Sequence, residues 1–179
     1  MKRYAKIAAR IRVPSGFAVA GLYVVFSRPT KGSFVAGVAA AFLGLALRGW
    51  AAGHLAKDEK LATTGPFAYT RNPLYLGSLV AGAGFALAGR VWWVAAVVGT
   101  YFLLVYLPVI GEEESHLRQL FPEYGEYAER VPRLLPRSDP AYSDAERFRW
   151  ELYLRNREYQ ALAAYLVVAA VLAWKLLTS

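Results

Sequence analysis

Apolar runs recur along the chain, and charged or Pro- and Gly-containing segments separate them. A helix of roughly 20 apolar residues is long enough to cross a bilayer. Of the 179 residues, 56% are hydrophobic, and their arrangement in blocks is typical of an integral membrane protein. The runs occupy residues 17–26, 33–47, 74–87, 91–110 and 161–177. The sequence therefore predicts an all-α, multi-pass transmembrane helical bundle of about five spans, in which the short first run also uses residues 11–16.

The basic residues favour one orientation of this bundle. Cytoplasmic segments of membrane proteins carry an excess of Lys and Arg. Five cations precede the first run, and residues 48–73 and 112–160 hold most of the others, which predicts a cytoplasmic amino terminus and cytoplasmic amphipathic helical segments. The net charge of +8 could indicate nucleic-acid binding, but cations placed beside apolar runs indicate topology and anionic headgroups instead. We therefore expect the lipid bilayer, and no nucleic acid, as a partner.

Few residues of the chain suit a metal ion or a catalytic thiol. The chain has no Cys, which excludes a disulfide framework, a thiolate zinc site and a Cys nucleophile. Its two histidines, His54 and His116, do not form a two-His helical metal motif. Glu112 and His116 have the i, i+4 spacing of a pair on a helix surface. We expect no metal site.

A polar cassette at residues 65–77 ends directly at the third apolar run. Pro66 and Pro73 fix φ and push the residue before each of them toward extended geometry. Gly65 allows the backbone to approach a neighbour closely. Taken alone, these features favour an interfacial loop that leads into a helix, with Arg71 on headgroup phosphates.

Three adjacent carboxylates, Glu112, Glu113 and Glu114, follow the next apolar run. Charges often mark the point where a span leaves the membrane, but three carboxylates repel one another and gain nothing from the positive-inside bias. Any that point into the protein need partners, such as Arg71 or a bound cation. One helical hairpin separates this cluster from the cassette, so both lie on the same predicted side. Together they could hold a polar cofactor beside a lipid-dissolved substrate.

Residues 61–77 resemble the cofactor cassette of the isoprenylcysteine carboxyl methyltransferase family, which shares its pattern with the phospholipid methyltransferases. Glu113 and Glu114 are similar to the Glu-Glu pair that follows a span in that family. The likeness extends upstream to residues 45–50 and covers the chain from about residue 40 to residue 137.

The resemblance implies an S-adenosylmethionine-dependent methyltransferase that acts on a lipophilic acceptor. Carboxylates would meet the amino group and sulfonium of this cofactor, and Arg71 would bind its carboxylate. The candidate catalytic residues are Arg71 and Glu113. The implied cofactor-binding residues are Leu61, Gly65, Tyr69, Arg71, Asn72, Pro73, Tyr75, Glu113 and Glu114.

The chain departs from the family pattern at Asn72, where the family usually has His. An Asn side chain donates and accepts hydrogen bonds, but it does not titrate near neutral pH. We therefore expect Asn72 to contact the cofactor and not to move protons.

Two other functions stay open. The membrane sterol reductases look related to the same superfamily and use a nicotinamide cofactor, so NADPH binding would indicate reductase chemistry. A non-catalytic membrane scaffold would bind neither ligand. The acceptor is open as well: a prenylated cysteine carboxylate, a phospholipid amine, a thiol and an isoprenoid acid all suit a lipophilic pocket. The atom that is methylated can therefore be O, N or S.

We expect a single membrane domain over residues 1–179, with a methyltransferase core at 40–137. The remainder, 138–179, would be a C-terminal extension that carries the last transmembrane helix. The protein would lie in a cell inner membrane or an endomembrane, with its active site facing the cytoplasm. Helix faces rich in Gly and Ala are compatible with a homodimer. The aromatic side chains of residues 121–127 are expected to pack an amphipathic helix onto the membrane face.

Overall fold

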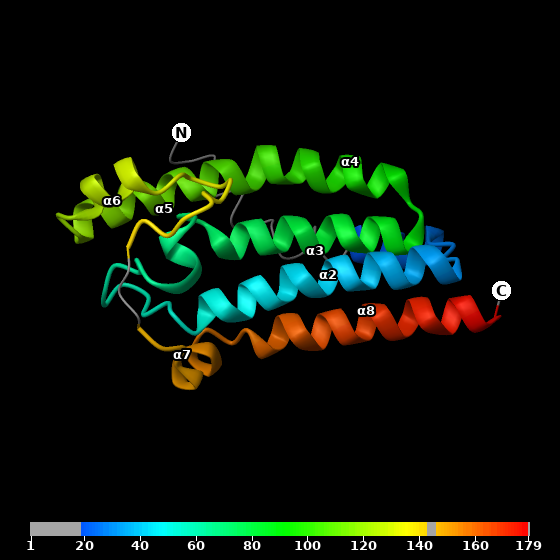
Figure 1. Ribbon diagram of the computed structural model, residues 1–179. Helices are drawn as coiled ribbons and strands as arrows, with labels where there is room; N and C mark the ends of the chain where they lie inside the picture. The colour runs from blue at the N-terminus through cyan, green and yellow to red at the C-terminus, as the bar shows by residue number, and fades with distance from the viewer. Residues whose placement is uncertain (1–18, 143–145, 179) are drawn as a thin grey trace.

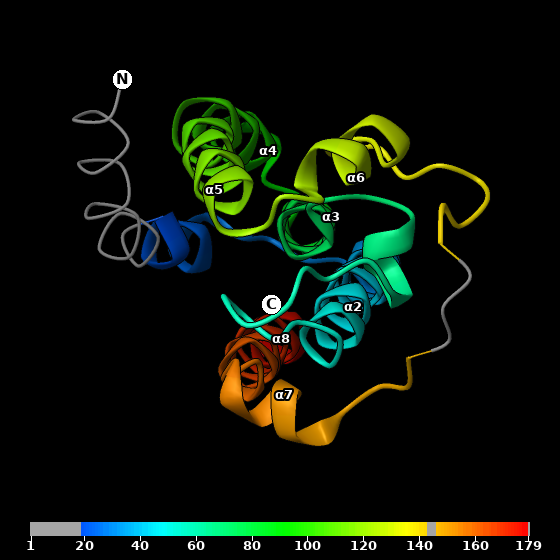
Figure 2. The same ribbon diagram turned by 90° about the vertical axis from the view of Figure 1, so that its left-hand side faces the viewer.

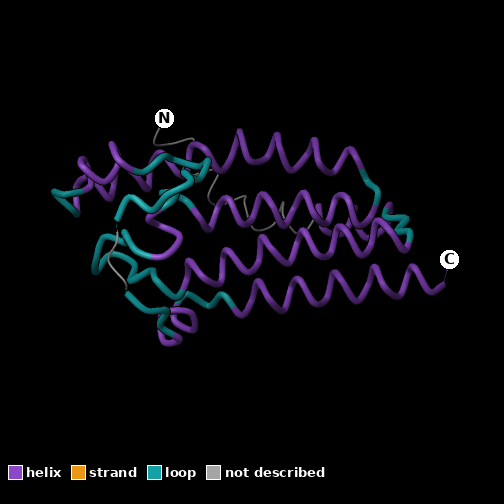
Figure 3. Tube along the Cα trace, in the orientation of Figure 1, coloured by secondary structure: helices purple, strands orange, loops and turns teal. Residues whose placement is uncertain are grey.

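The computed structural model describes residues 19–142 and 146–178, and this part of the chain contains helices and no strand (Figure 3). This confirms the predicted all-α class. Residues 19–26 are helical. The further helical elements, in chain order, are α2 (Lys31–Ala52), a 3-10 turn (Gly65–Ala68), α3 (Pro73–Gly89), α4 (Trp92–Tyr101), a π-helical turn (Phe102–Tyr106), α5 (Leu107–Leu120), α6 (Tyr124–Arg130), α7 (Trp150–Arg155) and α8 (Tyr159–Thr178).

The long helices run along a common direction, and the short ones gather at one end of them (Figure 1). α2 contacts both α3 and α8, and α3 also contacts α4. α6, α7 and the longer connections lie at the end that is on the left in Figure 1 and faces the viewer in Figure 2. We call this the polar end, because it carries the cassette and the acidic cluster.

Within residues 19–142 and 146–178, three helices are long and apolar enough to cross a membrane: Lys31–Ala52, Trp92–Leu120 and Tyr159–Thr178. The predicted run at 74–87 corresponds to Pro73–Gly89, an apolar helix of 17 residues. At 1.5 Å per residue its length is about 26 Å, slightly short of a hydrocarbon core. The first predicted run starts outside the described residues, as does the basic amino-terminal segment. The count of five spans and the cytoplasmic amino terminus therefore stay predictions.

Glycines bring α2 and α3 into backbone contact. A Cβ atom on Gly77 of α3 would lie only 2.6 Å from the carbonyl oxygen of Gly44 in α2. Gly37 and Gly84 make a similar approach farther along the same pair of helices. Small residues allow membrane helices to pack this closely, and van der Waals contact then stabilises the pair. The helix that begins at the cassette is thus fixed in place by its neighbour.

A π-helical turn interrupts the long helix Trp92–Leu120, and Pro108 explains its position. Proline has no N–H to donate to the carbonyl four residues earlier, which is that of Leu104, and its ring crowds this carbonyl. The N–H of Leu107 bonds to the carbonyl of Phe102, five residues back, as in a π-helix. The predicted run at 91–110 therefore continues as one helix that carries the acidic cluster beyond the apolar part.

The aromatic side chains near α6 lie inside the protein. Tyr124 and Tyr127 are 1% and 3% exposed, and they pack with Leu61 and Val131. The Tyr127 hydroxyl donates a hydrogen bond of 2.9 Å to the carbonyl of Phe67 in the cassette. The expectation that these rings face the membrane is therefore wrong, because residues 61–67 cover them. This small core holds α6 against the cassette.

Candidate functional site

A cavity of about 420 Å³ opens at the polar end between the 55–62 loop, the start of α3, α5 and α6. Its volume lies within the range of about 300–1,000 Å³ that small-molecule sites occupy. We call it the large cavity. Its wall consists of Arg48, Leu55, Lys57, Asp58, Lys60, Leu61, Ala62, Phe67, Arg71, Leu74, Tyr75, Ser78, Tyr106, Glu113, His116, Leu117, Phe121, Tyr124 and Tyr127.

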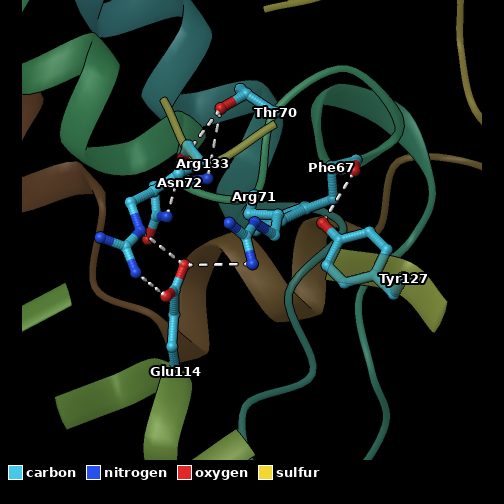
Figure 4. Close-up of polar contacts among 7 residues, drawn as sticks. All are labelled: Phe67, Thr70, Arg71, Asn72, Glu114, Tyr127 and Arg133. Atoms are coloured by element: carbon cyan, nitrogen blue, oxygen red, sulfur yellow. Dashed lines mark hydrogen bonds and ion pairs between the residues drawn. The ribbon is translucent and has the colours of Figure 1, made fainter. Parts of the chain in front are cut away.

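The cassette is clamped to the segment that follows α6. The Arg71 N–H donates to the carbonyl of Pro132 at 2.9 Å, and the Thr70 hydroxyl donates to the carbonyl of Leu134 at 2.9 Å. The Asn72 amide nitrogen donates to the carbonyl of Arg133 at 2.8 Å (Figure 4). These bonds satisfy backbone N–H and carbonyl groups that lie outside any helix and therefore have no partner in regular secondary structure. They fix the direction in which the Arg71 side chain leaves the loop.

Glu114 lies between two guanidinium groups (Figure 4). Its Oε1 is 3.4 Å from Arg71 Nη1 and accepts from Arg133 Nε at 3.1 Å, while its Oε2 accepts from Arg133 Nη2. The Glu114 side chain is 9% exposed, Arg71 is 12% exposed and Arg133 is 50% exposed. The bond to Glu114 raises the pKa of Arg133 further above its ordinary value. The carboxylate is therefore occupied within the protein, and the cassette and the acidic cluster meet through it.

Glu113, one residue earlier, has a different environment. It lines the large cavity, and its Oε1 accepts a hydrogen bond of 2.9 Å from the hydroxyl of Tyr75, which also lines the cavity. Consecutive residues on an α-helix point about 100° apart, so the two carboxylates leave α5 in different directions, Glu114 toward Arg71 and Glu113 toward Tyr75 and the cavity. Glu113 is the carboxylate that a cationic ligand could meet.

Arg71 is the cation of the cassette that reaches the large cavity. Besides its ion pair with Glu114, its Nε is buried and has no hydrogen-bond acceptor among the described residues. The guanidinium lines the cavity, and a charge-assisted hydrogen bond from it to an oxygen of an acidic ligand is among the strong ones. This donor set suits the carboxylate of an amino-acid-like ligand.

Two phenols of the cavity wall stay protonated at neutral pH. Burial raises the pKa of Tyr124, and the negative charge of Glu114 raises it further, although Arg71 opposes both effects. Burial also raises the pKa of Tyr127. Both rings can therefore pack against a ligand without adding charge to the cavity.

Four of the nine predicted cofactor-binding residues, Leu61, Arg71, Tyr75 and Glu113, form part of the cavity wall. The other five do not belong to the wall as the described residues define it, and their contact with a cofactor stays a prediction. Asn72 instead bonds the loop to the carbonyl of Arg133, and Glu114 forms an ion pair with Arg71. The remaining three are Gly65, Tyr69 and Pro73.

Several wall residues were not predicted as site residues. Asp58 of the 55–62 loop and His116 of α5 both line the cavity, with His116 Nε2 3.2 Å from Asp58 Oδ1. The expected partner of His116 was Glu112, four residues earlier on the same helix. The 55–62 loop offered no motif, and its contact with α5 depends on the tertiary fold.

The C-terminal extension holds one residue of the cavity wall, Arg48 of α2, in place. Glu158, just before α8, binds Arg48 Nε at 2.5 Å and Nη2 at 2.9 Å, and Arg48 Nη1 donates to Ser78 Oγ at 2.5 Å. A bidentate pair of this kind fixes both position and orientation of the guanidinium. The extension, which the sequence left without a role, thus holds one side of the cavity. The stretch at residues 45–50 was the only sequence signal for Arg48.

A second, smaller cavity of about 200 Å³ adjoins the first between α3 and α4. We call it the apolar cavity, because no charged side chain of the described residues lines it. Its wall is formed by Val19, Leu79, Gly82, Val97, Val98, Tyr101 and Phe102, together with Ser78 and Tyr106, which also line the large cavity.

His54 is buried behind the cassette. Its Nδ1 lies 3.1 Å from Thr64 Oγ1, and Gly65 adopts a positive φ of 55° directly against the imidazole ring. A Cβ on Gly65 would lie 2.7 Å from a ring carbon of His54, so glycine is required for both reasons. Burial lowers the pKa of His54 below 6.5, and a weaker effect of Glu146 opposes this.

Acidification is therefore expected to destabilise the protein through His54. Its contribution to stability is complete above the ordinary pKa of about 6.5 and is lost as the pH falls toward the lowered folded pKa, because the unfolded chain binds the proton first. Thermal unfolding in detergent between about pH 7.5 and about 5.5 should show a larger loss for the wild type than for His54→Asn, which cannot titrate. Equal losses in the two proteins would contradict this assignment.

Helices that can span a membrane, with a polar cavity at one end of them, are those of a helical integral membrane protein. The sequence model of the family described as "Phospholipid methyltransferase" matches residues 31–124, which is more than half of the chain. The chain belongs to this family, which confirms the resemblance found in the sequence.

Two curated proteins are similar to part of the chain. The "Cobalt-zinc-cadmium resistance protein CzcN" of Cupriavidus metallidurans is 38% identical over 81 residues, which are 45% of this chain and 38% of that protein. The "Nickel-cobalt-cadmium resistance protein NccN" of Alcaligenes xylosoxydans xylosoxydans is 37% identical over the same shares of both chains. The match thus spans well under half the length of either relative. No solved structure matches the chain.

Proposed function

We propose that the protein transfers a methyl group from S-adenosylmethionine to a lipophilic acceptor. The observation that carries this proposal is the wall of the large cavity, in which Arg71 of the cassette and Glu113 of the acidic cluster face one space. A guanidinium and a carboxylate in one cavity suit a ligand that carries both signs of charge. The aromatic and aliphatic residues between them suit an adenine ring.

When bound, S-adenosylmethionine supplies a methyl group on a positively charged sulfur. Arg71, which lines the cavity, would bind its carboxylate, and Glu113 would lie near its cationic groups. Tyr75 holds Glu113 in place through its hydroxyl. The packed phenols and Leu61 exclude water from this side of the cavity, which strengthens each charged contact. Fixed positions of this kind supply much of the rate of a displacement reaction.

The acceptor would use the apolar cavity. Its wall, as far as the structure describes the chain, contains no charged side chain; the space lies between two apolar helices and meets the large cavity at Ser78 and Tyr106. An acceptor chain buried there gains about 0.8 kcal/mol for each CH₂ group removed from water. A carboxylate or thiolate acceptor needs no general base, whereas an amine must lose a proton. We propose that the cofactor enters from the cytoplasm and the acceptor from the bilayer of a cell inner membrane or an endomembrane.

Binding of S-adenosylhomocysteine to the purified protein in detergent tests the cofactor directly. Calorimetry and thermal shift should both show binding, and NADPH in parallel samples should give no response. Glu113→Gln should weaken binding, whereas Glu112→Gln, which alters an exposed carboxylate outside the cavity wall, should not. Folded protein that responds to NADPH alone would favour a reductase, and no response to either ligand would favour a scaffold.

The acceptor can then be found with labelled S-adenosylmethionine. Incubation with a total lipid extract should transfer the label to a lipid, and mass spectrometry of that product identifies the methylated atom. Absence of labelled product with protein that binds S-adenosylhomocysteine would exclude a lipid acceptor from that extract.

A further inference from the structure

Tyr106 occupies the boundary between the two cavities. Only Tyr106 and Ser78 belong to both walls as the described residues define them. On one side are the charged groups of the large cavity, including Arg71 and Glu113. On the other side, the described residues of the wall contribute hydroxyls of Tyr and Ser as their only polar side-chain groups. The Tyr106 ring therefore stands where a polar head and an apolar chain of one molecule would have to meet.

Aromatic contacts fix the Tyr106 ring from both sides. Its centroid is 5.3 Å from that of Tyr75 and 5.7 Å from that of Tyr101, both edge to face, and it stacks on Phe102 at 5.8 Å with an interplanar angle of 18°. Edge-to-face and offset-stacked rings attract each other beyond their apolar contact. Tyr75 in turn bonds to Glu113, so the ring is linked to the cofactor side of the site.

The π-helical turn creates this arrangement. In a regular α-helix, residues five apart point about 140° away from each other. A π turn joins residues five apart by a hydrogen bond and places them one above the other. Tyr101 and Tyr106 thereby reach the same cavity, and Pro108 enforces the turn. Such turns are frequent at functional sites.

We propose that Tyr106 is the specificity-determining partition of the site: it confines the apolar chain of the acceptor to the apolar cavity and stops it from entering the large cavity. The acceptor is then an amphiphile with one slender apolar chain near its reactive head. A bulkier group beside the head is rejected by the ring. This inference rests on the proposed function for the role of the large cavity.

Photolabelling with a long-chain alcohol that carries a diazirine on its chain tests the partition. The purified protein is labelled in detergent, and the labelled residues are identified by mass spectrometry. In the wild type, label is expected on Leu79 and Val98 of the apolar cavity and not on Leu117 or Phe121 of the large cavity. In Tyr106→Ala the label on the latter two should rise several-fold. Tyr106→Phe, which keeps the ring, should behave as the wild type does.

Val97→Ala is the control, because Val97 lines the apolar cavity and is not one of the rings that hold Tyr106. It should leave the large cavity unlabelled. Tyr106→Leu replaces Tyr106→Ala if the Ala variant does not fold. Label on Leu117 or Phe121 in the wild type, or the same pattern in wild type and the ring-less variant, would overturn the proposal. S-adenosylhomocysteine binding, measured in the same samples, reports separately on the proposed function.

Discussion

Arg71→Ala is expected to weaken S-adenosylhomocysteine binding by about 10- to 150-fold, because a hydrogen bond between charged groups contributes about 1.5–3 kcal/mol. Arg71 lines the large cavity, is 12% exposed and has a buried Nε without an acceptor among the described residues. The variant removes the donor that we assign to the ligand's carboxylate. Calorimetry on detergent-solubilised protein measures the change, and methyl transfer at low cofactor concentration should fall in parallel.

Two variants separate a direct contact of Arg71 from an indirect effect. Arg133→Ala removes the other partner of Glu114, but Arg133 does not belong to the cavity wall, so the affinity should change little. Arg71→Lys keeps the charge and loses the planar fork of donors, and it should give an intermediate affinity. Equal losses in Arg71→Ala and Arg133→Ala would show that Arg71 acts only by holding Glu114.

The helices were predictable from the sequence because apolar runs and helix-stopping residues are local signals. The run at 33–47 became α2, and the run at 161–177 became α8, with ends shifted by a few residues. The end of the fourth run was not predictable in this way. Three charges in a row indicated where the apolar run ends, but the helix itself continues to Leu120, with Glu114 of the charged turn paired to Arg71 of the cassette.

Site residues that belong to a sequence motif could be predicted, whereas those that the fold brings together from distant parts of the chain could not. The expectation that the cassette and the acidic cluster meet agrees with the ion pair of Arg71 and Glu114. The pairs Arg48–Glu158 and Asp58–His116 join positions far apart in the chain, and no spacing in one sequence indicates them. Pro108 can be read from the sequence, but the sequence does not show that a π-helical turn forms before it. The direction in which the Tyr106 side chain points depends on that turn.

The different roles of the two adjacent carboxylates could not be predicted from the sequence either. Glu113 and Glu114 look alike in a motif, and both were expected to contact the cofactor. The direction in which each leaves the helix depends on the rotation of α5, which tertiary packing sets. Glu113 faces the large cavity, and Glu114 is buried between Arg71 and Arg133.

Glu114→Ala should therefore destabilise the fold by about 3–5 kcal/mol, since removing one partner leaves a buried charge uncompensated. The charge left behind is that of Arg71, whereas the half-exposed Arg133 can return to water. Glu113→Ala should cost only about 1 kcal/mol, the usual contribution of one hydrogen bond. Unfolding curves of both variants in the same detergent give the comparison.

The double variant Arg71→Leu with Glu114→Leu provides the stronger test of this explanation. Replacing a buried ion pair by apolar residues of similar size is often neutral, so the double variant should be more stable than Glu114→Ala, although it lacks two charged groups. It should still fail to bind S-adenosylhomocysteine, because Arg71 is absent. If it is as unstable as Glu114→Ala, the loss does not come from an unpaired Arg71, and Glu114 stabilises the cassette in another way.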